Sequence, residues 1–179
     1  MPEALLIVDF QNDFTPGGAL AVQDGDRIAG RVNELASDPR FELVVATRDW
    51  HPPDHGSFER QGGPWPVHCV QGTDGAELHP ALERSRVDVI VDKGQDSATE
   101  GYSGFEGTEL LELLRERRID RITVVGLATD YCVKNTALDA LRNGFEVRVD
   151  PEGVRGVDVE AGDSERAIEE LRQAGAVVE

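Results

Sequence analysis

The sequence has few cysteines, few lysines and few aromatic residues, and it lacks long apolar segments. Two cysteines in 179 residues are too few for the disulfide framework of a small secreted domain, so we expect free thiols in a reducing compartment. No apolar run approaches the roughly 18 residues that a membrane-spanning helix requires. The opening segment MPEALLIVDF also lacks the basic residues of a signal peptide. These absences predict a cytoplasmic protein.

Basic residues are scarce as well. The chain has 18 Lys and Arg against 35 Asp and Glu, which gives a formal net charge of -17. Nucleic-acid binding draws on clustered Lys and Arg that neutralise phosphates, and no such cluster is present. An acidic surface is also repelled by anionic membranes. Composition therefore argues against nucleic acid and anionic membranes as partners. It does not explain why the surface is acidic, and it does not give the number of subunits, so a homo-oligomer is possible.

Apolar runs alternate with helical segments along the chain. Runs typical of buried parallel strands cover residues 4–8, 43–46, 87–91, 122–125 and 145–149. Helical periodicity covers residues 26–36, 108–117, 131–143 and 164–174, and a short apolar tail follows at 176–178. This alternation predicts an α/β fold, a three-layer α/β/α sandwich around a mostly parallel sheet. The length predicts a single domain over residues 1–179.

Reactive side chains follow four of the apolar runs. They are Asp9, Asp49, Lys93 and Cys132. Ligands of open α/β sheets bind beyond the carboxyl ends of the strands, so these groups point to a site at one rim. Lys93 is one of only two lysines against sixteen arginines, which indicates a need for an ammonium group. Its alternative role is a simple ion pair with Asp92.

Cys132 opens a helical stripe in the stretch GLATDYCVKNTALDAL. A thiol in the first turn of a helix has a depressed pKa, because unsatisfied N–H groups and the helix dipole favour the thiolate. The alternative is a small buried hydrophobic residue, which is the commoner fate of a free cysteine. The motif alone leaves both open.

A cluster of metal-ligand residues lies in and beside the long Pro- and Gly-rich segment between the second and third apolar runs. Asp49, His51 and His55 are close in sequence, and His68 follows. One carboxylate with two or three imidazoles suits a divalent metal such as Zn, Mn or Fe and leaves coordination positions open. A single loop histidine is more often a hydrogen-bonding group, and we assign that role to His79.

Six stretches, in this order along the chain, resemble the isochorismatase-like cysteine hydrolase family. They are LLIVDFQNDF, TRDWHPPDHGSF, GPWPVHCVQGT, VDKG, YSGFEGT and GLATDYCVKNTALDAL. Together they span nearly the whole chain, and DWHPPDH and WPVHC resemble the nicotinamidase branch. The resemblance implies the isochorismatase-like hydrolase fold. It also implies hydrolysis of a small-molecule amide, nicotinamide, to nicotinate and ammonia in pyridine nucleotide salvage.

Carried over by motif, the family's catalytic triad falls on Asp9, Lys93 and Cys132. The resemblance implies that the cysteine forms a thioester with the substrate. It also implies an oxyanion hole built from the backbone N–H groups of Ala128 and Cys132, next to a cis peptide bond between Leu127 and Ala128.

The resemblance further implies one divalent metal ion (Zn, Fe or Mn) that orients the pyridine ring. Its ligands fall on Asp49, His51 and His68, and His55 matches a position that serves as a ligand in some members only. Apolar and aromatic residues would form the pocket walls, with plain core packing as the alternative for each. These residues are Phe14, Leu20, Trp65, Tyr102 and Tyr131.

Two other functions compete with this interpretation. Another cysteine hydrolase of the same scaffold would act on a carbamoyl or ureido amide, or cleave an isochorismate vinyl ether, and such relatives generally lack the metal cluster. A catalytically silent, metal-binding scaffold protein is the second alternative, but the intact triad residues argue against it. The metal's identity, the activity on pyrazinamide and the role of Cys69 stay open, with Cys69 more simply a wall residue.

Overall fold

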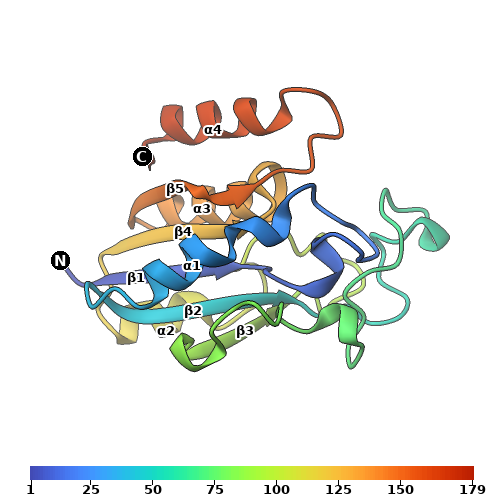
Figure 1. The fold of residues 1–179 in the computed structure, drawn as a ribbon, viewed down its shortest axis with the longest axis horizontal. Coiled ribbons are helices and arrows are strands. Elements are labelled where there is room, and N and C mark those ends of the chain that lie inside the picture. The colour runs from blue at the N-terminus through green and yellow to red at the C-terminus, as the bar shows by residue number, and fades with distance from the viewer.

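The computed structural model describes all 179 residues and contains one six-stranded sheet (Figure 1). The strands are β1 (Glu3–Val8), β2 (Phe41–Asp49), β3 (Val89–Lys93), β4 (Arg121–Leu127), β5 (Glu146–Arg155) and β6 (Val177–Val178). Their spatial order is β3-β2-β1-β4-β5-β6, and every neighbouring pair is parallel. The predicted α/β class is confirmed, and the sheet is parallel throughout.

Helices cover both faces of this sheet. They are α1 (Ala29–Ala36), α2 (Leu110–Glu116), α3 (Lys134–Arg142) and α4 (Asp163–Ala174). Leu5 and Ile7 of β1 pack with α1 on one face, the face turned toward the viewer in Figure 1. Leu6 and Val8 pack with α2, α3 and α4 on the other face, because side chains alternate along a strand. The three predicted layers are therefore present. None of the helices combines the length and the apolar character that a membrane span requires.

Two predicted helices begin differently in the structure. The segment expected from residue 26 starts as a 3₁₀ turn at Gly25–Ile28 and becomes α-helical only at Ala29. The segment expected from residue 131 starts as a π-helical turn, Thr129–Val133, in which Val133 N–H donates to Ala128 C=O over 3.1 Å. Cys132 thus lies in a wide turn before α3 and not in the first turn of an α-helix.

The strand order places a crevice at the carboxyl end of β1. The chain runs from β1 outward to β2 and β3, then returns to β4 on the other side of β1. Connections depart in opposite directions at such a switch point, which is where open α/β sheets bind ligands. Most of the long segment 50–86 lies at this end of the sheet, and its last 3₁₀ turn, Arg84–Arg86, leads back to the start of β3 (Figure 1).

Candidate active site

Lys93 is the centre of a buried cluster at the ends of β1, β2 and β3. Its Nζ lies 2.8 Å from Asp9 Oδ2, 2.5 Å from Asp49 Oδ1 and 3.4 Å from Cys132 Sγ. Nζ also donates a hydrogen bond to the backbone carbonyl of Gly101 over 2.8 Å. None of the four charged or thiol side chains belongs to a residue more than 6% exposed. The structure therefore brings together the four strand-end residues that the sequence singled out.

Burial and charge pull the pKa values of this cluster in opposite directions. Burial alone would lower the pKa of Lys93, but the carboxylates of Asp49 and Asp9 outweigh it and hold that pKa well above its usual range. Burial raises the pKa of Asp9 although Lys93 acts against it. Burial would also raise the pKa of Asp49, but Lys93 and His51 hold it well below its usual value. The pKa shifts therefore favour a charged ammonium on Lys93 and a charged carboxylate on Asp49, and they make the Asp9 carboxylate the more basic of the two.

The Cys132 thiol differs from the expectation of a depressed pKa. Burial raises the pKa of Cys132 well above its usual value, and the nearby carboxylates of Asp9 and Asp49 add to the effect of burial, while Lys93 acts against it. A helix start in the sequence indicates a favourable dipole, but only the fold brings two buried carboxylates close to the sulfur. The resting group is therefore a thiol that needs a base.

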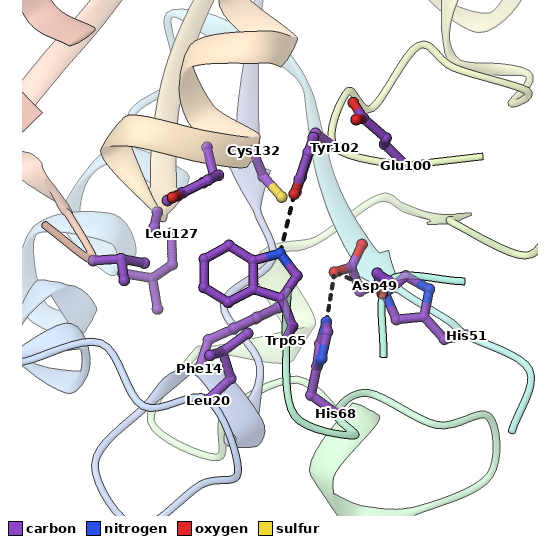
Figure 2. Close-up of a pocket in the computed structure, with 14 residues that line it drawn as sticks. Phe14, Leu20, Asp49, His51, Trp65, His68, Glu100, Tyr102, Leu127 and Cys132 are labelled. Carbon is purple, nitrogen blue, oxygen red and sulfur yellow. Dashed lines mark hydrogen bonds and ion pairs between the residues drawn. The ribbon is translucent and has the colours of Figure 1, made fainter. Parts of the chain in front are cut away.

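Asp49 also belongs to a second cluster, with His51 and His68. One ligand atom from each of the three residues lies within 4.8 Å of the others. His51 Nδ1 is 2.7 Å from the carbonyl of Gly94 and His68 Nδ1 is 2.8 Å from that of Pro66. These bonds leave each Nε2 facing Asp49 Oδ2, at 3.3 and 3.8 Å (Figure 2). Oriented imidazoles with a carboxylate fit a divalent metal ion.

The other two histidines differ from this pair. The His55 ring stacks on His51 with centroids 3.9 Å apart, and its Nδ1 lies 2.6 Å from Ser57 Oγ. Its Nε2 is buried without a hydrogen-bond partner, and burial lowers the pKa of His55 to about 4. His55 is not in the three-residue ligand group, so its role as a further ligand stays a prediction. His79 Nδ1 accepts a hydrogen bond from Ala81 N–H over 3.1 Å, which confirms the loop role.

Asp49 and Cys132 connect the two clusters to one cleft with mostly apolar walls (Figure 2). The space between the walls is about 450 Å³, counting the open mouth. All five residues expected in the walls line it, namely Phe14, Leu20, Trp65, Tyr102 and Tyr131. Trp65 Nε1 donates to Tyr102 Oη over 3.0 Å, and the Trp65 and Tyr131 rings meet edge to face at 5.0 Å. Sequence reasoning missed four wall residues: Ser57, Glu100, Leu127 and Val157.

The turn after β4 carries the remaining predicted features. The peptide bond between Leu127 and Ala128 is cis, as expected. Ala128 and Cys132 both line the cleft. The second cysteine, Cys69, is fully buried, and its backbone N–H donates to Asp13 Oδ2 over 2.7 Å. Burial raises the pKa of Cys69 well above its usual value, and Cys69 packs in the core and does not line the cleft.

Two polar residues that support the clusters were not predicted. Gln11 Nε2 donates to the carbonyl of Asp49 over 2.8 Å, and Gln11 Oε1 accepts the N–H of Asp49 over 2.9 Å. Thr47 Oγ1 donates to Asp9 Oδ1 over 2.8 Å. The signal that could have found Thr47 is strand periodicity, since residues two apart on β2 point to the same face and Asp49 is two residues further on.

Comparison with known proteins agrees with this geometry. The family model of the isochorismatase domain matches residues 3–179. The nicotinamidase of Escherichia coli is 43% identical over 99% of this chain and 94% of its own length. The zinc complex of the pyrazinamidase of Pyrococcus horikoshii is 47% identical with a TM-score of 0.92, covering 100% of this chain and 99% of that one.

The Leishmania protein PnC1 (L. infantum), solved in complex with nicotinate, is 38% identical with a TM-score of 0.94. The match covers 99% of this chain and 92% of that one. A family model that spans nearly all residues, and relatives that match along almost their full length, leave no part of the fold unaccounted for. The chain belongs to the isochorismatase family.

Proposed function

We propose that the protein hydrolyses nicotinamide to nicotinate and ammonia through a thioester on Cys132. The observation that carries the proposal is the buried contact of Lys93 Nζ with Asp9, Asp49 and Cys132, at the floor of an aromatic cleft. Relatives with nicotinamidase activity in their names, and a neighbour that holds nicotinate, support this substrate.

In the first half-reaction Asp9 acts as the general base. Its carboxylate takes the proton from Cys132 Sγ as the sulfur attacks the carboxamide carbon. The carbonyl oxygen becomes an oxyanion, which the backbone N–H groups of Ala128 and Cys132 stabilise. Loss of one such donor typically raises a barrier by about 2.7–4 kcal/mol, so these amides carry a large part of the rate.

Collapse of the tetrahedral intermediate breaks the C–N bond. Asp9 donates its proton to the departing nitrogen, which leaves as ammonia, and the acyl group stays on Cys132 as a thioester. A water molecule then attacks the thioester carbon while Asp9 takes its proton. Nicotinate leaves, and Cys132 regains its proton. The ammonium of Lys93 favours the ionised form of Asp9 before each proton transfer, and it favours negative charge on sulfur.

Asp49, His51 and His68 would hold one divalent ion, Zn, Fe or Mn, beside the aromatic walls. When bound, such an ion supplies a Lewis-acid contact for the pyridine nitrogen and so orients the ring. The structure of the P. horikoshii neighbour in complex with zinc supports metal binding. One oxygen of Asp49 contacts Lys93, and the other faces His51 and His68. Asp49 would therefore fix the position of the metal, and with it the pyridine ring, relative to the catalytic cluster.

Ammonia release from a panel of primary amides tests the proposal. The panel contains nicotinamide, pyrazinamide, a ureido amide and a carbamoyl amide, each with and without chelator followed by metal. We expect nicotinamide turnover that falls with chelator and disappears in Cys132→Ala, which keeps its metal. Cys69→Ala is the matched control and keeps its turnover. Turnover of the ureido or carbamoyl amide without nicotinamide turnover, or residual turnover in Cys132→Ala, contradicts the proposal.

A further inference from the structure

The Thr47 hydroxyl contacts the Asp9 carboxylate, and neither the motifs nor the triad gives it a role. Thr47 lies near the end of β2 and is fully buried. Its Oγ1 donates to Asp9 Oδ1 over 2.8 Å and accepts the N–H of Asp9 over 3.2 Å. A single hydroxyl therefore binds both the side chain and the backbone of the proposed base.

This contact distinguishes the two oxygens of the Asp9 carboxylate. Oδ1 is occupied by the Thr47 hydroxyl. Oδ2 is the oxygen that Thr47 does not bind; it lies 2.8 Å from the ammonium nitrogen Lys93 Nζ and remains available to accept a proton from the thiol. An Asp9 carboxylate oxygen and Cys132 Sγ lie within 4.8 Å of each other. Asp9 also has a φ of 48°, a left-handed conformation that a non-glycine residue keeps only when its surroundings hold it.

We propose that Thr47 is a positioning residue, whose hydroxyl fixes the Asp9 carboxylate so that Oδ2 accepts the proton of Cys132. The inference rests on the proposed function, because it assigns Asp9 as the base for that thiol. General bases contribute about 10²- to 10⁴-fold to a rate, and they do so only within hydrogen-bond reach of the proton. Rotation of the carboxylate away from sulfur therefore slows the chemical step and leaves substrate binding unchanged.

A purely structural role for the Thr47 hydroxyl is the competing explanation. Backbone pairing already joins Thr47 to Val8 of β1, so the strands are held without the hydroxyl. The chain also contains a matched contact at the opposite end of β1, where buried Thr123 Oγ1 donates to Glu3 Oε1 over 2.6 Å. The Thr123 contact has the same chemistry as the Thr47 contact, but its acceptor Glu3 belongs to neither side-chain cluster of the active site.

The test compares Thr47→Val, Thr47→Ser and Thr123→Val in the full-length, metal-loaded protein. We measure kcat and KM for ammonia release from nicotinamide, and the rate at which iodoacetamide alkylates Cys132, read by mass spectrometry. In Thr47→Val we expect kcat to fall about tenfold or more, because small misplacements of a catalytic group have large effects, while KM stays within about twofold. The alkylation rate falls with kcat. Thr47→Ser recovers most of the loss, and Thr123→Val keeps the wild-type kcat.

Three results overturn the inference: a Thr47→Val kcat within about threefold of wild type, a Thr47→Ser variant as slow as Thr47→Val, or an equal kcat loss in Thr123→Val. If Thr47→Val does not fold, Thr47→Ala removes the same hydroxyl and is judged by the same criteria. Failure of the proposed function is separate, because wild-type protein would then release no ammonia from nicotinamide. In that case the alkylation rates still test the role of Thr47, because alkylation by iodoacetamide requires the Cys132 thiolate but no turnover of an amide substrate.

Discussion

Replacing Lys93 with Met removes the only ammonium from the buried cluster. Lys93 is 1% exposed, and its Nζ contacts Asp9 Oδ2 at 2.8 Å and Asp49 Oδ1 at 2.5 Å. Met has a similar length and no charge, so the substitution keeps the packing and leaves two buried carboxylates without their cation. The variant therefore measures what the charge contributes.

Removal of one partner from a buried ion pair costs about 3–5 kcal/mol of folding free energy, because the remaining charge is left unpaired. In the variant we expect Asp9 to take up a proton, since burial already raises its pKa with Lys93 present. Asp49 keeps His51 Nε2 at 3.3 Å from its Oδ2 and stays ionised.

A carboxyl group with a pKa raised in the folded state contributes stability at low pH that is lost as pH rises through that pKa. The deficit of Lys93→Met relative to wild type therefore grows with pH, by about 1.4 kcal/mol per pH unit while Asp9 is protonated only in the folded chain.

Urea unfolding at pH 6 and pH 8, in the presence of chelator and followed by tryptophan fluorescence, measures this deficit. The control is Lys134→Met, which removes the other lysine. Lys134 Nζ lies 3.5 Å from Glu170, and the two side chains are 27% and 54% exposed. An exposed pair contributes at most about 1 kcal/mol, so the control should lose little and lose it equally at both pH values. A Lys93→Met variant as stable as Lys134→Met at both pH values refutes the electrostatic argument.

Three further predictions concern the cleft and its support. His51→Ala should lower bound metal at least about tenfold, because His51 Nε2 faces Asp49, whereas His79→Ala should keep the metal because the His79 ring binds Ala81 N–H instead. Elemental analysis that finds full metal in His51→Ala removes His51 from the ligand set. Asp130→Asn should lower stability by about 1.5–3 kcal/mol, since its buried carboxylate accepts two backbone N–H groups of the loop after β5. An unchanged urea midpoint would show that this contact is dispensable. Tyr102→Phe removes the acceptor of the Trp65 N–H and should raise KM for nicotinamide about two- to tenfold with little change in kcat, and steady-state kinetics with a larger effect on kcat would contradict a wall role.

The sheet could be predicted from the sequence because its central strands are buried on both faces. Residues 4–8 and 122–125 form continuous apolar runs, and the structure has β1 and β4 there. The end of β5 was missed, since Asp150 and Pro151 break the apolar pattern while the strand resumes pairing at Val154. The local pattern of apolar residues indicates which residues are buried. Whether a strand continues past an irregularity depends on its pairing with the neighbouring strand, here β4.

The reactive residues could be identified because strand ends concentrate at one rim, but their supports could not. Gln11 and Thr47 contact Asp49 and Asp9 across 38 residues of sequence. Strand periodicity places Thr47 on the same face of β2 as Asp49, but it does not show that the hydroxyl contacts Asp9. Likewise, Glu100 and Val157 reach the cleft from loops whose course depends on the tertiary fold. Motif reading finds the groups that react, whereas the residues that orient them become visible only once the chain is folded.

The state of the Cys132 thiol shows why those orienting contacts matter. A cysteine near a helix start suggests a preformed thiolate, but the folded site places two carboxylates and one ammonium around the sulfur, and the pKa is raised by burial and by those carboxylates. Ionisation of the thiol at rest would add a second uncompensated negative charge to a group of side chains hidden from water. The proton therefore has to move when the amide is in place, directly to a carboxylate oxygen that is already correctly aimed. Catalysis in such a site depends on the aim of Asp9 as much as on the reactivity of sulfur, which gives the Thr47 hydroxyl a kinetic effect out of proportion to one hydrogen bond.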